Sequence, residues 1–196
     1  MIYRNYIKRL LDLVFSIVLL PFFAVLLVIV APLIKFTDRG PVFYNADRIG
    51  LNGKIFKMFK FRSMRVNAPD IRNEDGTTFN SENDPRVTRI GKTLRKTSID
   101  EVPQLLNVLI GDMSWIGSRP DLPDALDVYS DEDRKKLSVR PGITGYSQAY
   151  YRNSAEFSQK MKGDVYYAEN VSFLLDLKIL IKTMQTVLKR DNLYRN

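Results

Sequence analysis

The 196-residue chain contains neither cysteine nor histidine. Without cysteine, disulfide bonds and Cys-based zinc sites are excluded. Without histidine, the chain lacks the usual general base and the commonest transition-metal ligand. Any catalysis must therefore rely on carboxylates, hydroxyls, lysine or arginine, and a hard cation such as Mg²⁺ is the metal that suits such groups.

Acidic residues are the minority among the charged side chains. The chain has 30 Lys and Arg against 22 Asp and Glu, which gives a net charge of +8 and a pI of about 9.6. This balance suits an anionic partner: nucleic acid, an anionic membrane surface or a phosphorylated substrate. The length suits one compact domain with a short additional segment.

The longest stretch without charge runs from Leu13 to Ile34 and consists almost entirely of Leu, Val, Ile, Phe and Ala. As a straight helix it would extend about 33 Å, enough to cross a bilayer core. A cleaved signal peptide is the weaker interpretation, because the run is long for one and no small-x-small cleavage site follows it. The sequence therefore predicts a membrane-inserted helix.

Basic residues flank this run on both sides, at Arg4, Lys8, Arg9, Lys35 and Arg39. The positive-inside rule would keep both flanks in the cytoplasm, which requires the helix to turn back. Pro21 lies near the middle of the run and removes a helical hydrogen bond there. A kinked spanning helix is an equally good interpretation of these features, since prolines are tolerated in membrane helices.

The remaining sequence alternates between extended and helical patterns. We expect a hairpin across 40–64, a polar loop over 66–86, a short basic segment at 87–96, a helix over 100–110 ending at Gly111, an acidic helix near 123–137 and an amphipathic helix over 172–190. The last helix carries Lys178, Lys182 and Lys189 among its polar positions. It would either pack on the core or lie along a membrane interface.

A pair of acidic residues, Asp100 and Glu101, opens the helix predicted at 100–110. Ser98 and Glu101 have capping-box spacing, which is a purely structural interpretation. Pro103 is comfortable only in a first helical turn, so it places both acids at the helix start, where backbone N–H groups favour phosphate. With basic residues just upstream, an aspartate here could instead be a carboxylate nucleophile for phosphoryl chemistry. Both interpretations stay open on spacing alone.

The motif around this pair reads Arg95-x-x-Ser98-Ile-Asp100-Glu101-Val-Pro-Gln-Leu-Leu-Asn107-Val-Leu-x-Gly111-Asp-Met-Ser114. It resembles the signature of the small monotopic phosphoglycosyl transferases, which are bacterial sugar transferases that include PglC-type enzymes and the catalytic domain of larger undecaprenyl-phosphate galactose phosphotransferases. The resemblance covers nearly the whole chain. It extends to Lys8-Arg9, Gly40-Pro-Val-Phe43, Arg48-x-Gly50, Lys60-Phe-Arg62-Ser-Met64, Arg140-Pro-Gly-Ile-Thr-Gly145, Asp164-Val-Tyr-Tyr and Asp176-Leu-Lys-Ile.

The resemblance implies an α/β fold in which a re-entrant helix-break-helix (1–36) precedes a membrane-associated catalytic domain (37–196). It also implies a phosphosugar transfer from a UDP-sugar to polyprenyl phosphate, releasing UMP, at the cytoplasmic face of a bacterial inner membrane. The implied nucleophile is Asp100, which would attack the β-phosphate and carry the phosphosugar covalently. Asp100 is also the implied ligand of a Mg²⁺ cofactor, and Glu101 would help to position the metal or the acceptor.

Further residues are expected to bind substrate or phosphate: Lys60, Arg62, Arg95, Arg119, Arg140, Gln148, Arg152 and Asn153. The chain departs from the family pattern at Ser118, at Tyr150 and Tyr151, and in the position of Pro21, so the identity of the sugar and the place of the bend stay open. The main rival is a non-enzymatic basic membrane protein that recruits partners or anionic lipids. A nucleic-acid partner is not expected, because no recognised binding motif is present. Membrane lipids are expected partners, and a homodimer is left open.

Overall fold

The computed structural model describes residues 2–72, 79, 81, 83–151 and 156–189. Its helices are α1 (Lys8–Asp38), α2 (Arg89–Lys96), α3 (Gln104–Ile110), α4 (Asp131–Arg134), α5 (Tyr146–Tyr150), α6 (Phe157–Glu169) and α7 (Phe173–Lys189). Its strands are β1 (Phe43–Ile49), β2 (Ile55–Phe61), β3 (Ser114–Ile116) and β4 (Gly142–Thr144). The mixture of helices and strands agrees with the predicted α/β class.

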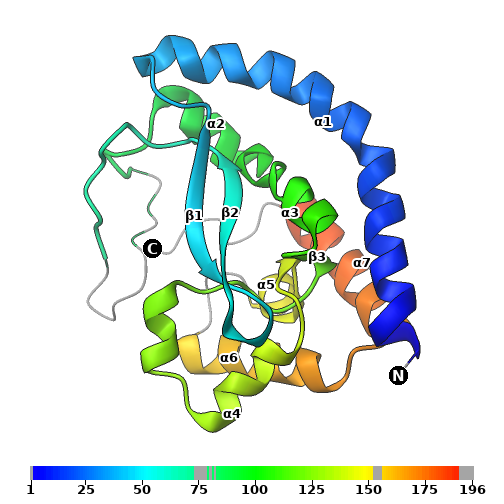
Figure 1. The fold of residues 1–196 in the computed structure, drawn as a ribbon. Coiled ribbons are helices and arrows are strands. Elements are labelled where there is room, and N and C mark those ends of the chain that lie inside the picture. The colour runs from blue at the N-terminus through cyan, green and yellow to red at the C-terminus, as the bar shows by residue number, and fades with distance from the viewer. Residues whose placement is uncertain (1, 73–78, 80, 82, 152–155, 190–196) are drawn as a thin grey trace.

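The predicted hairpin is confirmed. Strands β1 and β2 pair antiparallel from Phe43 opposite Phe61 to Ile49 opposite Ile55. The turn between them places Asn52 and Gly53 at positive φ, 54° and 78°, a region that asparagine and glycine tolerate best. Strands β3 and β4 form a separate parallel pair. Figure 1 shows the hairpin upright in the middle of the molecule, with α4 and α6 below it.

Helix α1 is long and apolar enough to cross a membrane by length and composition. Its helical structure continues through Pro21 and ends where Arg39 adopts a left-handed conformation. The predicted helix-break-helix is therefore not what the structure has: α1 continues through both Pro21 and Pro32. Each proline removes one helical hydrogen bond, and the strain can be taken up by curvature. Figure 1 shows this curvature: α1 arches along one side of the molecule.

One face of α1 packs on the rest of the chain along most of its length. Its buried residues are Asp12, Ser16, Phe23, Val30 and Ile34. The second half of the helix joins Phe61 of β2 and Leu94 of α2 in one apolar cluster. The opposite face remains exposed, with Phe22 and Val28 at 70% and 75%. The outward face of the helix is thus apolar, and its inward face combines apolar packing with the polar residues Asp12 and Ser16.

Polar bonds fix the first half of α1. The Asp12 carboxylate accepts hydrogen bonds from the Ser114 hydroxyl and the Trp115 backbone N–H, both at 3.1 Å. The Trp115 indole N–H donates to the Ser16 hydroxyl at 2.9 Å. Because these groups are largely buried, each bond replaces one to water and fixes the position of the helix on β3.

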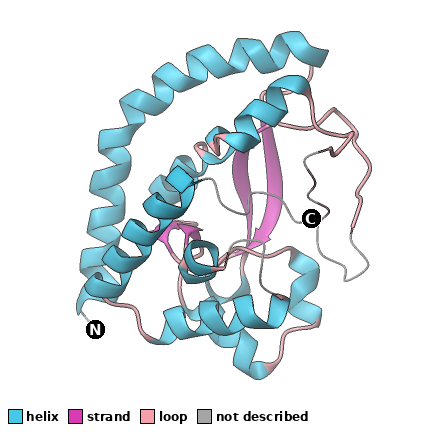
Figure 2. Cartoon of the chain, turned by 180° about the vertical axis from the view of Figure 1, so that it is seen from behind, coloured by secondary structure: helices cyan, strands magenta, loops and turns pink. Residues whose placement is uncertain are grey.

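The buried Asp176 carboxylate of α7 joins the N-terminal segment of the chain to α6 and α7. It accepts hydrogen bonds from the Tyr3 hydroxyl at 2.6 Å, the Lys8 ammonium at 2.7 Å and the Tyr167 hydroxyl at 2.7 Å. Figure 2 shows the result from behind, where α7 lies beside the N-terminal end of α1. The amphipathic helix predicted over 172–190 is therefore confirmed as α7, whose exposed apolar side chains include Leu174 and Ile181.

The prediction of one continuous acidic helix near 123–137 is wrong. The structure has a 3₁₀ turn at Pro123–Asp127, the four-residue α4 and a second 3₁₀ turn at Lys135–Ser138. Ser130 caps α4 by accepting the Asp133 N–H, and Asp133 accepts the Ser130 N–H in return. This capping box starts a new helix in the middle of the predicted one.

Replacing Asp176 by asparagine should lower the free energy of unfolding by about 3 kcal/mol, because it leaves the largely buried Lys8 ammonium without its counter-ion. Thermal or denaturant unfolding of the detergent-solubilised protein measures the change. The matched control is Asp47→Asn, which breaks an exposed pair with Lys57 and should cost less than about 1 kcal/mol. Equal effects of the two substitutions would contradict the anchoring role of Asp176.

Candidate active site

The acidic pair lies in a 3₁₀ turn, Ile99–Glu101, between α2 and α3. Ser98 starts this turn in a left-handed conformation, and its side chain makes no capping hydrogen bond. The capping-box interpretation of Ser98 and Glu101 is therefore wrong, because α3 itself begins only after Pro103. The two carboxylates are not needed to cap the helix, which leaves them available for chemistry.

Asn107 of α3 sets the distance between the acidic pair and β2. Its fully buried side chain accepts a hydrogen bond from the Phe59 N–H at 2.9 Å and donates to the Lys57 carbonyl at 2.7 Å. These two bonds attach α3 to β2, because the amide pairs with a backbone N–H and a backbone C=O of the strand as the backbone of a neighbouring strand would. Farther along β2, the Lys60 ammonium consequently reaches Glu101 at 2.7 Å.

The two carboxylates have different electrostatic environments. Asp100 is 9% exposed, and burial raises its pKa to about 6, with Lys60 and Arg95 opposing the rise and Glu101 adding to it. Burial also acts to raise the pKa of Glu101, but Lys60, Arg119 and Arg95 outweigh it and lower that pKa. Glu101 is thus held as the ion-paired carboxylate and Asp100 as the more basic one.

Three predicted anion binders surround the pair. Lys60 comes from β2, Arg95 from α2 and Arg119 from the loop after β3. The Arg95 Nε donates to the Ser63 hydroxyl at 3.0 Å, and its other N–H groups have no hydrogen-bond partner in the described part of the chain. Positive charge from Arg95 and Arg119 acts on Glu101. The arrangement is a positively charged rim around two carboxylates.

The loop that carries Arg119 is anchored to Asp164 of α6. The Arg119 backbone N–H donates to the Asp164 carboxylate at 3.1 Å, while the Arg119 side chain is exposed. Lys136 holds the same carboxylate at 3.0 Å and Asp121 at 2.7 Å, and Ser147 donates to Asp164 at 2.6 Å. A loop tied in this way presents its arginine in a defined place.

The other predicted site residues either have described partners apart from the acidic pair or lie outside the described residues. Arg62 is 6% exposed and donates to the Pro41 and Met64 carbonyls, so its described bonds serve the backbone. Arg140 donates to the Gly111 carbonyl at 2.8 Å, at the end of α3 opposite to Asp100. Gln148 donates to the Ile143 carbonyl, and its buried Oε1 has no partner among the described residues. Arg152 and Asn153 lie outside the described residues.

Arg48 of β1 belongs near the site although it was not among the predicted binders. Burial lowers its pKa, and the charge of Arg119 lowers it further, which places these two guanidinium groups within electrostatic reach. Adjacent guanidinium groups repel each other unless an anion lies between them. The Arg48-x-Gly50 motif was the sequence signal that could have identified it.

The donor atoms present fit Mg²⁺ only in a shared mode. Among the described residues, no group of three or more acidic side chains could enclose a metal ion. Mg²⁺, however, is commonly bound by one or two carboxylates together with substrate phosphates and waters. Asp100 supplies such a carboxylate, since no side chain in the described part of the chain donates a hydrogen bond to it.

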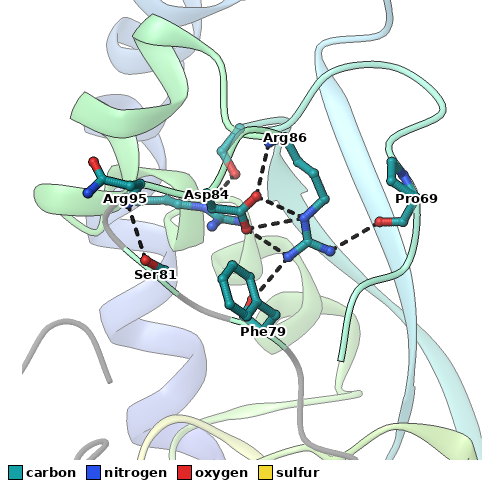
Figure 3. A network of polar contacts seen from close by, with 8 residues as sticks. Pro69, Phe79, Ser81, Asp84, Arg86 and Arg95 are labelled. Atoms are coloured by element: carbon teal, nitrogen blue, oxygen red, sulfur yellow. Dashed lines mark hydrogen bonds and ion pairs between the residues drawn. The ribbon is translucent and has the colours of Figure 1, made fainter. Parts of the chain in front are cut away.

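A polar network organises the loop that leads into α2. The buried Arg86 guanidinium donates to both oxygens of the buried Asp84 carboxylate, at 2.7 Å to 3.1 Å, and to the Pro69 and Phe79 carbonyls at 3.1 Å (Figure 3). Arg95 lies close enough for its charge to act on Asp84. The network therefore connects a predicted loop to an arginine of the site.

Comparisons with known proteins agree on one family. The sequence profile of the family described as "Bacterial sugar transferase" matches residues 3–190. The chain is 42% identical over 189 residues to "Galactosyl transferase CpsE" of Streptococcus agalactiae, and 39% identical over 207 residues to "Undecaprenyl-phosphate galactose phosphotransferase" of Salmonella typhimurium. These matches cover 92% and 97% of this chain but 42% of each relative.

A shorter relative matches over most of its own length. "Exopolysaccharide production protein ExoY" of Rhizobium meliloti is 41% identical over 192 residues, which cover 92% of this chain and 84% of the relative. The chain therefore spans less than half of some curated relatives and most of others.

The Asp84–Arg86 pair yields a stability prediction. Asp84→Asn should lower the free energy of unfolding by about 3 kcal/mol near pH 7, because it leaves a buried guanidinium unpaired. Hydrogen bonds from Arg86 hold the pKa of Asp84 below its ordinary value. Stability from this pair is therefore fully present above the ordinary pKa of an aspartate and is lost as pH falls through the folded-state pKa.

Thermal unfolding of both proteins across acidic and neutral pH tests this. The difference between them should shrink as Asp84 becomes protonated. The control is Asp70→Asn, whose exposed pair with Arg72 should have little effect at any pH. A difference between wild type and Asp84→Asn that does not change with pH would contradict the ion-pair explanation.

Proposed function

The chain belongs to the bacterial sugar transferase family, and we propose that it transfers a sugar 1-phosphate from a UDP-sugar to polyprenyl phosphate, the first step in assembling a bacterial glycoconjugate. Two relatives carry names of this activity: the undecaprenyl-phosphate galactose phosphotransferase and a "UDP-N-acetylgalactosamine-undecaprenyl-phosphate N-acetylgalactosaminephosphotransferase" of Aeromonas hydrophila. The relatives that act on different sugars leave the sugar of this chain open.

The observation that carries the proposal is the position of the acidic pair against the apolar helix. Ile99 and Val102, the neighbours of Asp100 and Glu101 in sequence, pack into the same cluster as Phe23 and Val30 of α1. A soluble nucleotide sugar approaches such a site from water, while a phosphate on a lipid approaches along α1. A reaction between a water-soluble nucleotide sugar and a lipid phosphate needs a site at the boundary between water and membrane.

In the first step, a carboxylate oxygen of Asp100 attacks the β-phosphorus of the UDP-sugar. The bond from that phosphorus to the oxygen bridging the two phosphates breaks, and UMP leaves with the electron pair. The product is an acyl phosphate that joins Asp100 to the phosphosugar. Arg95 and Arg119 are placed to stabilise charge on the diphosphate, and Lys60 holds Glu101.

In the second step, a phosphate oxygen of the polyprenyl phosphate attacks the same phosphorus. The phosphorus–oxygen bond to Asp100 breaks, the free carboxylate is restored and a polyprenyl diphosphate sugar is released. Mg²⁺, when bound with Asp100 and the substrate phosphates as ligands, would neutralise anionic charge that otherwise repels both nucleophiles.

We further propose that both ends of α1 lie at the cytoplasmic face. Packed residues run from Asp12 to Ile34, so the catalytic domain accompanies the helix along most of its length. A helix crossing the bilayer would carry that domain, with its charged loops, into the hydrocarbon core, which is energetically prohibitive. A curved helix lying in one leaflet lets lipid cover its exposed face, and α7 adds an apolar surface nearby.

Single cysteines test this topology cleanly, because the chain has none of its own. Ile2→Cys and Thr37→Cys place thiols at the two exposed ends of the helix. Both should resist a membrane-impermeant maleimide in intact cells and react after the membrane is opened. Asn83→Cys, on an exposed position of the catalytic domain, is the matched control. Labelling of one end alone in intact cells would mean a spanning helix.

Asp100→Asn should lower turnover by at least about a thousand-fold while the protein stays folded, because the amide keeps the shape but is not a nucleophile. The decisive assay omits the acceptor: wild-type enzyme should exchange labelled UMP into the UDP-sugar, and Asp100→Asn should not. Asp47→Asn, which breaks only an exposed pair with Lys57 on the hairpin, is the control and should retain exchange.

The rival reaction is direct attack of the lipid phosphate on the UDP-sugar. If active wild-type enzyme shows no UMP exchange without acceptor and no phosphosugar on the Asp100 peptide, the covalent route is wrong. If purified protein releases no UMP from any UDP-sugar with polyprenyl phosphate and Mg²⁺, the proposed activity itself fails.

A further inference from the structure

A second basic site lies at the other end of α3. A cavity of about 280 Å³ opens there between the N-terminal segment that leads into α1 and the start of β4, and its charged lining residues are Arg4, Lys8, Arg9, Asp12 and Arg140. Helix α3 has seven residues between Asp100 and this end, a length of about 10 Å. The cavity is therefore separate from the acidic pair, although Arg140 was predicted to serve the substrates.

Two arginines meet at Gly111, where α3 ends. Arg140 donates to the Gly111 carbonyl at 2.8 Å, and Arg9 donates to the Val108 and Leu109 carbonyls at 2.6 Å and 3.0 Å. A Cβ on Gly111 would lie only 3.4 Å from Arg9 Nη2, so the guanidinium covers the glycine. The charges of the two arginines repel each other across this point.

Capping of α3 accounts for only part of this positive charge. A helix C-terminus carries roughly half a negative charge, whereas two full positive charges converge on it. One carboxylate, Asp12, also lines the cavity; it accepts hydrogen bonds from Ser114 and Trp115, and its charge offsets part of the positive charge of Lys8 and Arg9. Asp176 pairs with Lys8. The positive charges of Arg4 and Arg140 remain in excess of these two carboxylates.

Donor groups also remain unused in the cavity. Arg140 bonds through Nε alone, and its Nη groups contact no acceptor in the described part of the chain. Arg4 uses one Nη group, for the Ser138 carbonyl and hydroxyl. A guanidinium offers five N–H donors, so both arginines can still bind an anion. Charge and free donors together make the cavity an anion site.

We propose that this cavity binds the phosphate of an anionic membrane glycerophospholipid. Arg4 lies in the π-helical turn Tyr3–Ile7 that leads into α1, and Lys8 and Arg9 lie in the first turn of α1. Exposed apolar side chains adjoin these residues, among them Tyr6, Leu10 and Leu11 at 73%, 61% and 44%. A lipid whose acyl chains lie along these side chains places its phosphate at the cavity. Basic pockets beside membrane helices at the cytoplasmic side bind acidic headgroups for this electrostatic reason.

Such a lipid would fix the depth and orientation of α1 without entering the reaction. The site does not depend on the proposed transferase activity, because it uses none of Lys60, Asp100 or Glu101. Its occupancy would hold the N-terminal end of α1 at the headgroup level, while the acidic pair stays beside the second half of the helix.

The test uses the intrinsic fluorescence of Trp115, the single tryptophan of the chain. Its backbone N–H bonds Asp12, and its neighbour Ser114 lines the cavity. The full chain in detergent micelles is titrated with short-chain phosphatidylglycerol, short-chain phosphatidylcholine and inorganic phosphate. We expect a saturable change with phosphatidylglycerol, and binding at least about five-fold weaker for the other two.

Two variants assign the binding to the cavity. Arg140→Gln and Arg4→Gln should each weaken phosphatidylglycerol binding by about five-fold. Lys35→Gln, which removes one exposed charge at the opposite end of α1, should leave the affinity unchanged. Circular dichroism checks folding, and Arg4→Gln decides the matter if Arg140→Gln proves unstable.

Three results would overturn the proposal. Phosphatidylcholine that binds as tightly as phosphatidylglycerol would remove the requirement for an anion. Inorganic phosphate that binds as tightly would reject the lipid as ligand. Wild-type affinity in both arginine variants would place any lipid binding elsewhere on the protein.

Discussion

The arrangement of the molecule depends on the buried amide of Asn107. Its side chain bonds the backbone of β2 at Phe59 and Lys57, and its own carbonyl accepts the N–H groups of Gly111, Asp112 and Met113. One fully buried residue therefore fixes the helix to the hairpin and also closes the turn after the helix. Loss of either set of bonds would leave buried polar groups unsatisfied, which is costly in a core of this kind. Asn107 thereby helps to fix the position of α3 relative to β2, and with it the positions of the acidic pair, of Lys60 and of the arginines at Gly111.

Helix α3 then acts as a short axis with different chemistry at its two ends. At its start, Asp100 and Glu101 face a rim of basic side chains; at its end, Arg9 and Arg140 meet at Gly111. Helix α1 passes alongside, attached near one end by Asp12 and Ser16 and near the other by Phe23 and Val30. The membrane helix is consequently part of the catalytic domain's core, and not a tether for it. In the proposed topology, this packing would hold the reaction site at a fixed height relative to lipid.

The parts of the fold that local sequence determines were predictable. Aromatic and β-branched residues around a Gly-rich break predicted the hairpin, and the spacing of apolar residues predicted α7. The parts that depend on distant partners were not. Ser98 has the spacing of a cap but adopts a left-handed conformation, and Ser130 caps a helix within a stretch that reads as continuous. Both Arg95 and Arg140 were predicted to bind substrate, but Arg95 lies near the acidic pair and Arg140 lies at the opposite end of α3. Tertiary contacts set the position of each side chain, and sequence spacing does not encode those contacts.

The division of roles within the acidic pair follows from which carboxylate receives the lysine. Lys60 is bonded to Glu101, and so the neighbouring Asp100 keeps a carboxylate without a side-chain partner among the described residues. Burial makes that carboxylate more basic than an ordinary aspartate, with a pKa of about 6, yet it stays mostly ionised at neutral pH. A more basic carboxylate is a better nucleophile, whereas a direct ion pair would have reduced both its basicity and its freedom to attack. In the proposed reaction Glu101 thus holds the positive charge close to the phosphates, and Asp100 remains free to form the bond.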